Sequence, residues 1–327
     1  MRFRQLIGRL ALTTLLGVSS FSSAKPQFDL AGYTDDSGAI TVLNNGNSAD
    51  PYFAMQALLL AYENGMDISG PAEKFANWLV PHQKPDGTFD RFCRDAVKAW
   101  VSCKTADADD SLLAIWMKLL ETMPAKLKNN PVWMKSYLIS KASLDQLFQP
   151  SRGIYMVSRV YLHGLFMDNL EVWSLKAHLK QPKQVAEANK LARAISDTFW
   201  DPVDKRFLVS TQLEQRAEIK VFYPDHVAQI FPLLVDFPLL PSTEKLVYSN
   251  WMNVHRQDWL NQSKTDYPWG LLAVLAVRQN DTTSARCWLR EASPLRHSSR
   301  WAVSDEASYQ ILMSKNLVPA EKKTSCK

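Results

Sequence analysis

The stretch TADADDSLLAIWMKLLE, from Thr105 to Glu121, places three aspartates directly before a strongly apolar run. A helix that is apolar on nearly every side belongs in the interior of a protein. Aspartate is a preferred residue at a helix start, because its carboxylate accepts backbone N–H groups and suits the positive end of the helix dipole. The stretch therefore predicts a buried helix that begins near Asp107.

The same opening recurs along the chain. Between the apolar segments lie amphipathic ones with charged faces, such as PAEKFANWLV, VAEANKLARAISDTFW and TTSARCWLREA. Three intervals also contain a turn followed by alternating apolar residues, which predicts a short strand or hairpin. These inserts read DGTFDRF, RGIYMVSR and KRFLVSTQL. The six aspartates that open an apolar segment are Asp50, Asp107, Asp168, Asp225, Asp266 and Asp305.

This alternation predicts an all-α ring. Apolar helices have to be interior and amphipathic helices cover them, and a self-similar array of such pairs is typical of a repeat architecture. We therefore expect an (α/α)6 toroid of six inner and five to six outer helices, formed as a single domain by residues 25–327. The inner helices of such a ring run parallel, so the six aspartates and the short β-hairpin inserts should share one face, that of the active site.

The first 24 residues have the composition of a secretory signal peptide. Two arginines precede an apolar stretch, and Ser22-Ser23-Ala24 forms a small-residue exit, so we expect cleavage after about Ala24 and a periplasmic or secreted protein. No later segment predicts a membrane-spanning helix, so we expect no stable membrane insertion. With Arg2, Arg4 and Arg9 removed, 35 of the 38 Lys and Arg residues remain against 33 Asp and Glu. No basic stripe indicates nucleic-acid binding, and we expect a monomer.

The cysteines suit an exported protein, in which disulfides persist. Cys93 and Cys103 flank Trp100 at a spacing that could bridge a hairpin, so we predict this disulfide, whereas Cys287 and Cys326 could be free or paired. No Cys or His spacing indicates a zinc site. The acids of the DADD segment could bind Ca²⁺ or Mg²⁺, but they lack EF-hand spacing. We therefore expect neither a metal nor a cofactor.

Capping explains one aspartate per helix but not the further acids in the first turns. Hydrolysis of a glycosidic bond needs two carboxyl groups, one protonated and one ionised, and crowding of acids raises the pKa of one of them. A sugar site also needs apolar platforms with polar edges. The surplus acids are Asp109, Asp110, Glu171 and Glu306. The aromatic residues expected near this face are Tyr33, Tyr52, Trp100, Tyr155, Trp173, Tyr223, Tyr267, Trp269 and Trp301.

In this layout the chain resembles the six-hairpin (α/α)6 glycosidase superfamily over nearly its whole length after the leader. Asp107-Ala108-Asp109, followed by an apolar helix, is similar to the Asp-Ala-Asp signature of glycoside hydrolase family 8. Members of that family cleave β-1,4-linked polysaccharides, typically with inversion. The resemblance implies that Asp107 binds the sugar at the cleavage subsite. The family's general acid is the glutamate of a Ser-Glu-Gly motif, which here falls on Ala49 in SADPYFAM, with Asp50 one place later.

We therefore predict an exported glycoside hydrolase that cleaves a polysaccharide or oligosaccharide by carboxylate acid–base catalysis with inversion. The predicted acid is Asp50, Asp107 holds the sugar, and Asp225 or Asp168 is the base. The other predicted substrate-binding residues are Asp110, Glu306, Tyr155, Trp173, Tyr223, Trp269 and Trp100.

Other functions stay open. An alanine at position 49 also fits a non-catalytic glycan-binding protein of exopolysaccharide export. DNLE at Asp168 resembles the Asp-Asn pairs of unsaturated uronyl hydrolases. DADD also fits the Asp-x-Asp-Asp pattern of class II terpene cyclases, for which an exported protein is a poor setting. Residues that could serve a polysaccharide lyase on this fold are Tyr155, Arg159, Tyr223 and His226.

Overall fold

The computed structural model describes residues 25–95, 97, 99–216 and 220–326, and within these residues it contains twelve α-helices and seven short strands. The predicted leader, residues 1–24, lies outside the described residues. No helix in the described part of the chain is long and apolar enough to cross a membrane.

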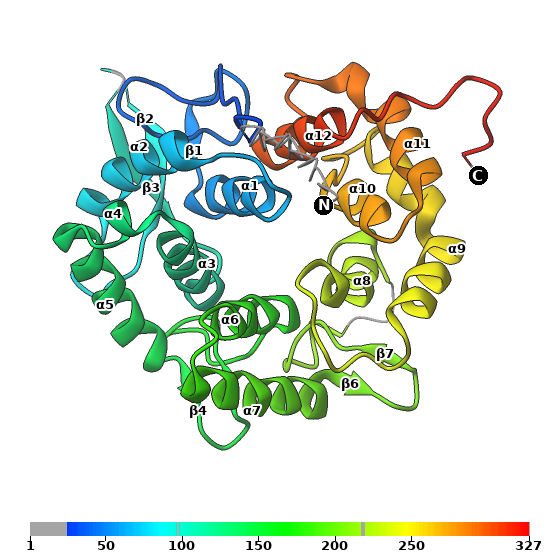
Figure 1. Cartoon of the computed structure of the whole chain (residues 1–327). Coiled ribbons are helices and arrows are strands. Elements are labelled where there is room, and N and C mark those ends of the chain that lie inside the picture. The colour runs from blue at the N-terminus through cyan, green and yellow to red at the C-terminus, as the bar shows by residue number, and fades with distance from the viewer. Residues whose placement is uncertain (1–24, 96, 98, 217–219, 327) are drawn as a thin grey trace, which may run out of the picture.

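Two concentric rings of helices form the molecule (Figure 1). Counted over the described residues, six helices make the inner ring and five make the outer one, and the short α4 (Ala125–Lys128) follows α3 and precedes α5 in the chain. The inner helices are α1 (Pro51–Glu63), α3 (Asp109–Thr122), α6 (Phe166–His178), α8 (Val227–Leu234), α10 (Leu271–Arg278) and α12 (Val303–Ser314). The outer helices are α2 (Ser69–Leu79), α5 (Pro131–Asp145), α7 (Pro182–Phe199), α9 (Glu244–Gln262) and α11 (Thr282–Ala292). The predicted (α/α)6 toroid is confirmed.

Burial explains which helices are inner and which are outer. In α3 ten residues are buried, on all sides of the helix, whereas α7 buries only one stripe, Ala188, Leu191, Ala192, Ile195 and Phe199, spaced three or four residues apart. Each fully buried large aliphatic or aromatic side chain contributes about 1.5–3 kcal/mol. The ring closes where α12 packs against α1, beside a backbone hydrogen bond of 2.8 Å from Val303 N to Val42 O.

The three predicted inserts form antiparallel strands. β1 (Ser48–Ala49), β2 (Asp90–Arg94) and β3 (Trp100–Thr105) make one sheet in that order. The other two are the pairs β4 (Phe148–Gln149) with β5 (Ile154–Tyr155), and β6 (Trp200–Asp201) with β7 (Arg206–Phe207). Each insert follows an outer helix and precedes an inner one, so all three emerge at the face where the inner helices begin.

Both cysteine pairs are bridged. Cys93–Cys103 joins β2 to β3, as the spacing predicts, and Cys287–Cys326 ties the C-terminal segment to α11.

The helix starts differ from the prediction, because only Asp50 is an N-cap among the six aspartates. Its Oδ1 accepts a hydrogen bond of 3.0 Å from Tyr52 N. Backbone pairing fixes several of the other starts instead. At α3 the carbonyl of Val157 accepts Asp109 N at 2.8 Å, and strand-like bridges hold Leu165 and Ala302, the residues immediately before α6 and α12. Asp107 and Asp168, at the starts of α3 and α6, are therefore not needed as caps.

Candidate functional site

A cavity of about 370 Å³ lies at the face where the inner helices begin. Pockets of this size accommodate small-molecule ligands. Its wall combines carboxylates, aromatic rings and one arginine, which is the mixture that a sugar site requires. The carboxylates are Asp50, Asp107, Asp168, Asp266 and Asp305, the aromatic residues are Tyr52, Phe53, Tyr223, Phe231, Tyr267 and Trp269, and the arginine is Arg91.

Arg91 connects two of these acids. It comes from β2, and its Nε lies 2.8 Å from Asp50 Oδ2 while its Nη2 forms an ion pair with Asp107. Burial raises the pKa of Asp50, although the Arg91 charge and the Tyr52 backbone N–H oppose the shift. The Asp107 side chain is 78% exposed, whereas that of Asp50 is 12% exposed. The arginine thus holds one buried and one solvent-facing carboxylate at the same wall of the cavity.

Asp168 is an acid of the cavity wall that can carry a proton at neutral pH. It is the third residue of α6, and its Oδ2 is buried with no hydrogen-bond partner among the described residues. Burial raises the pKa of Asp168 to about 7, and the negative charge of Asp107 adds to the shift. A substantial share of Asp168 is therefore protonated at neutral pH, in the same cavity as a carboxylate held by arginine.

Two further acids lie behind Asp168, away from this wall. Asp110 is fully buried, and neither of its oxygens has a hydrogen-bond partner among the described residues. Burial and then the charge of Asp168 raise the pKa of Asp110 well above its usual range. Glu171 Oε1 lies 2.7 Å from the hydroxyl of Tyr52, and burial and the Asp168 charge raise the pKa of Glu171 to about 8. Low-dielectric surroundings thus favour the protonated form of all three acids.

Aromatic rings also line the cavity. The rings of Tyr223 and Trp269 lie 5.2 Å apart and are tilted by 33°, and Tyr223 is 56% exposed. The Phe53 and Tyr267 rings meet edge to face at 6.0 Å. Tyr223 therefore offers an exposed apolar surface on which a sugar ring could pack.

Asp305 lines the cavity but serves the fold. Its Oδ1 accepts Gly270 N at 2.8 Å, at the start of α10, and its Oδ2 accepts Ala302 N at 3.1 Å. Burial raises the pKa of Asp305 to about 7 even so. With both oxygens engaged, this side chain fixes two neighbouring inner helices relative to each other.

The structure places three of the predicted acids elsewhere. The carboxylate of Asp225 accepts a hydrogen bond of 3.3 Å from Val221 N and lies 3.7 Å from Lys220 Nζ. These contacts hold Asp225 within its own turn, and it does not line the larger cavity. Glu306 is 2% exposed and accepts two bonds from Arg296, with further bonds from Trp301 and Gln310. Asp110 is sealed in the core. The first turn of a helix points its residues in several directions, so proximity in sequence did not bring these acids to the wall of the larger cavity.

Three predicted aromatic residues also lie away from the cavity wall. Tyr155 and Trp173 are buried, and Trp173 packs edge to face on Phe237. Trp100 belongs to the β2–β3 hairpin, where its Nε1 donates to Asp35 at 2.8 Å. Tyr223 and Trp269 are the predicted aromatic substrate-binding residues that do line the cavity.

Arg91 and Phe53 are cavity residues that the sequence did not indicate. In the insert DGTFDRF, Arg91 lies two residues after Phe89 and one before Phe92, so the alternation of a strand does not assign it to one face. An irregularity in the pairing between Arg91 and Phe92 interrupts the alternation within β2. The pairing of β2 with β1, which directly precedes Asp50, is what brings Arg91 to the acids.

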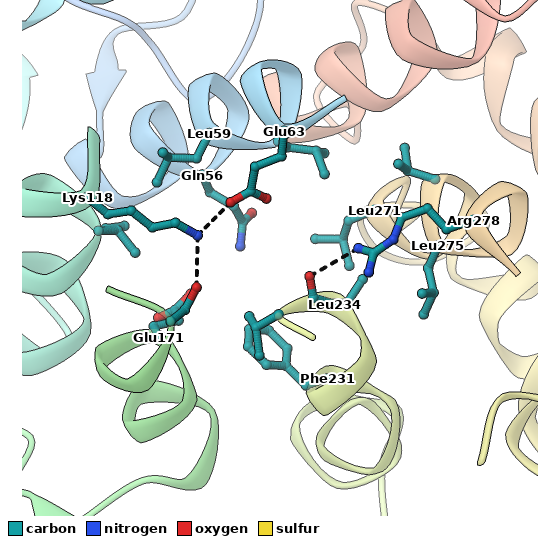
Figure 2. A pocket seen from close by; sticks show the side chains of 15 residues that line it. Gln56, Leu59, Glu63, Lys118, Glu171, Phe231, Leu234, Leu271, Leu275 and Arg278 are labelled. Carbon is teal, nitrogen blue, oxygen red and sulfur yellow. Dashed lines mark hydrogen bonds and ion pairs between the residues drawn. The ribbon is translucent and has the colours of Figure 1, made fainter. Parts of the chain in front are cut away.

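A smaller cavity of about 90 Å³ continues along the axis of the barrel (Figure 2). It shares Gln56, Phe231 and Leu271 with the larger cavity. Its polar side chains are already paired, since Lys118 Nζ donates to Glu63 at 2.5 Å and to Ser174 at 2.8 Å. Its wall is otherwise mostly apolar, which makes it a floor beneath the larger cavity.

No family model matches the chain, and no curated protein matches it in sequence. A reducing-end xylose-releasing exo-oligoxylanase matches its structure with a TM-score of 0.57 and 13% identity, covering 89% of this chain and 89% of that one. An alpha-amylase from Clostridium perfringens matches with a TM-score of 0.56 and 10% identity, covering 88% and 94%. A cold-adapted family 8 xylanase matches with a TM-score of 0.55 and 10% identity, covering 92% and 90%.

These similarities show that the chain has the (α/α)6 toroid fold of these enzymes, as the sequence predicted. At such low identity they show the fold alone. The same fold also occurs in a D-mannose isomerase, and function belongs to a site rather than to a fold.

Proposed function

We propose that this protein is a glycoside hydrolase that cleaves an oligosaccharide or polysaccharide in the larger cavity. The observation that carries the proposal is that one cavity contains two kinds of carboxyl group. Burial and the charge of Asp107 raise the pKa of Asp168 to about 7, whereas Asp50 and Asp107 are held as carboxylates by Arg91. Two carboxyl groups with opposite protonation states are what glycosidic cleavage needs. The aromatic wall and the fold shared with xylanases support the same function.

In the proposed reaction Asp168 is the general acid. It donates its proton to the glycosidic oxygen as the bond to the anomeric carbon breaks. A water molecule attacks that carbon from the other side and gives its proton to Asp107, which is exposed to solvent and oriented by Arg91. One water is consumed, and proton exchange with solvent restores both carboxyls. Attack by water without a covalent intermediate inverts the anomeric configuration.

These roles differ from those predicted from the sequence. One carboxylate oxygen of Asp50 accepts a hydrogen bond from Tyr52 N, and the other lies beside Arg91 Nε. We therefore propose that Asp50 positions the arginine and does not donate the proton. Asp107 becomes the base, and Asp168 becomes the acid.

We also propose that the protein is exported. Disulfides form and persist in oxidising compartments, and both Cys93–Cys103 and Cys287–Cys326 are bridged. The apolar leader of the sequence fits the same route.

A non-catalytic glycan-binding protein is the second candidate. The engagement of both Asp50 oxygens favours it, because Asp50 is the residue nearest to the position of the general acid in glycoside hydrolase family 8. Such a protein would retain the aromatic wall and bind glycans without cleaving them.

The test is hydrolysis of a panel of xylo-, cello- and chito-oligosaccharides, followed by mass spectrometry and by NMR of the first-formed anomer. We expect cleavage of at least one of them with inversion. Asp168→Asn should lower the rate by about 10²- to 10⁴-fold and retain substrate binding measured by calorimetry. Asp197→Asn, on the exposed side of outer helix α7, is the matched control. An unchanged rate in Asp168→Asn would remove Asp168 from catalysis, and binding without cleavage by the native protein would support the second candidate.

A further inference from the structure

A second group of chemistry-bearing side chains lies outside the cavity, between an inner and an outer helix. His226 is the last residue of a π-helical turn, Phe222–His226, that leads into α8, and His255 and Asp258 belong to α9. One ligand atom from each of the three lies within 4.8 Å of the other two. Over the described residues no other group of three His, Cys, Asp or Glu side chains comes this close together.

The local geometry directs these side chains to one point. His255 and Asp258 are three residues apart on α9, so they share one face of that helix. The rings of His226 and His255 lie 4.0 Å apart with a tilt of 31°. His226 Nδ1 lies 4.0 Å from Asp258 Oδ2. Two imidazoles and a carboxylate thus converge from two elements that are far apart in sequence.

Both histidines also present a buried nitrogen with nothing to bind. The Nδ1 atoms of His226 and His255 are buried, and neither has a hydrogen-bond partner among the described residues. Leaving a buried polar nitrogen unsatisfied costs free energy. Such atoms usually indicate a missing water, ion or ligand. A shared ion would satisfy both at once.

We propose that His226, His255 and Asp258 bind a divalent transition-metal ion of the zinc type. Two imidazole nitrogens and one carboxylate oxygen are an accepted ligand set for Zn²⁺, with a fourth position left for water. Bonds of about 2.0–2.1 Å place neighbouring ligand atoms roughly 3.3 Å apart, so the three side chains need only rotate slightly inward. The Asp258 side chain is 57% exposed, which leaves a path for the ion.

The scaffold holds the histidines in place. Trp251 Nε1 donates to the carbonyl of His226 at 2.7 Å, and the Trp251 ring lies 5.4 Å from the ring of His255. The ion would join α9 to the turn that also carries Tyr223, an exposed residue of the cavity wall. Its role would be to fix this wall, because it lies outside the reacting groups.

The proposal is tested on the full chain without a polyhistidine tag, after treatment with a chelator. Zn²⁺ is titrated by calorimetry, and Co²⁺ is followed by visible absorption. We expect one tightly bound Zn²⁺ per chain and the intense spectrum of four- or five-coordinate Co²⁺. His255→Gln and Asp258→Asn should each weaken Zn²⁺ binding by about tenfold or more. His178→Gln, a half-buried histidine on α6, should leave it unchanged.

Equal Zn²⁺ affinity in native protein and both ligand variants would overturn the proposal, as would a six-coordinate Co²⁺ spectrum. If a variant fails to fold, labelling of native protein by diethylpyrocarbonate replaces it. Zn²⁺ should protect His226 and His255, but not His178, in peptide mass spectra. Equal labelling of His226 and His255 with and without Zn²⁺ would contradict the site. None of these measurements depends on glycan hydrolysis.

Discussion

Arg91 Nε lies 2.8 Å from Asp50 Oδ2 and so joins a β-hairpin to the N-cap residue of inner helix α1. The hairpin follows outer helix α2, whereas Asp50 caps α1. Through its ion pair with Asp107 the same arginine also reaches the start of α3. One cation therefore sets the spacing of two inner helix starts at the cavity wall.

Replacing Arg91 by glutamine should raise the pKa of Asp50 further, because the arginine charge now opposes the effect of burial. It should also release Asp107. We expect a loss of hydrolysis of about tenfold or more, since misplaced catalytic groups are costly. Steady-state kinetics would detect the loss, and NMR of the carboxyl carbons would show the pKa change. The control is Arg193→Gln on the exposed side of α7. Full activity in Arg91→Gln would show that the ion pairs are dispensable.

Activity should fall as pH rises through about 7. The general acid has to be protonated, and burial together with Asp107 raises the pKa of Asp168 to about 7. We therefore expect kcat/KM to decline on the alkaline side with an apparent pKa near this value. The variant Asp107→Asn removes a negative charge and should lower the pKa of Asp168, measured by NMR of its carboxyl carbon. An unchanged pKa of Asp168 in this variant would contradict the effect of Asp107.

The free energy of unfolding should depend on the same group. The folded pKa of Asp168 exceeds its unfolded value of 3.8, so the folded state binds more protons between these values. Its contribution is fully present below pH 3.8 and is lost as pH rises through about 7. As pH rises from 5 to 8, the free energy of unfolding of Asp168→Asn should thus increase by roughly 2 kcal/mol relative to that of the native protein. Urea unfolding at both values checks this, and a parallel pH response of the two proteins would contradict the raised pKa.

Asp305→Ala should destabilise the protein by about 2–4 kcal/mol, because it leaves the buried N–H groups of Gly270 and Ala302 without their acceptor. Asp266→Ala is the matched control, since Asp266 is exposed and accepts from Tyr267 N, the residue next to it. Its effect should stay within about 0.5 kcal/mol. Chemical denaturation would measure both. Similar losses in the two variants would show that the backbone bonds of Asp305 are unimportant.

Tyr223→Ala should weaken glycan binding by about tenfold, because truncation of a central aromatic residue commonly costs more than about 1 kcal/mol. Tyr223 is exposed and tilted against Trp269 in the cavity wall. Tyr161→Ala, which removes an exposed tyrosine that does not line the cavity, is the comparison. Calorimetry with an oligosaccharide would distinguish them. Equal affinities for all three proteins would place the sugar elsewhere.

Much of the fold could be predicted because the signals were local. The all-round burial of α3 and the single buried stripe of α7 follow from which residues repeat at which spacing. The strand inserts and the Cys93–Cys103 bridge also lie within short stretches of sequence. The positions of the helix starts could not be predicted, because backbone groups distant in sequence, such as the Val157 carbonyl at α3, satisfy the N–H groups that an aspartate was expected to cap.

The site was predicted only in outline for a related reason. The sequence placed Asp50, Asp107 and Asp168 at one face, and the structure brings all three to one cavity. The sequence did not indicate that Asp225 pairs with Val221 N and that Glu306 pairs with Arg296, both away from the cavity. The partner of each acid depends on the direction in which its side chain points. The position of a residue near a helix start does not determine that direction.

The amino-acid sequence by itself determined the ring, since hydrophobic periodicity decides which helix faces must leave water. It also determined that acidic helix starts gather at one end. Only the tertiary structure decided the protonation of each acid, because a pKa depends on burial and on the charges that folding brings near, such as the charge of Asp107 acting on Asp168. The convergence of His226 with His255 is likewise a property of packing, since the two histidines belong to different helical elements.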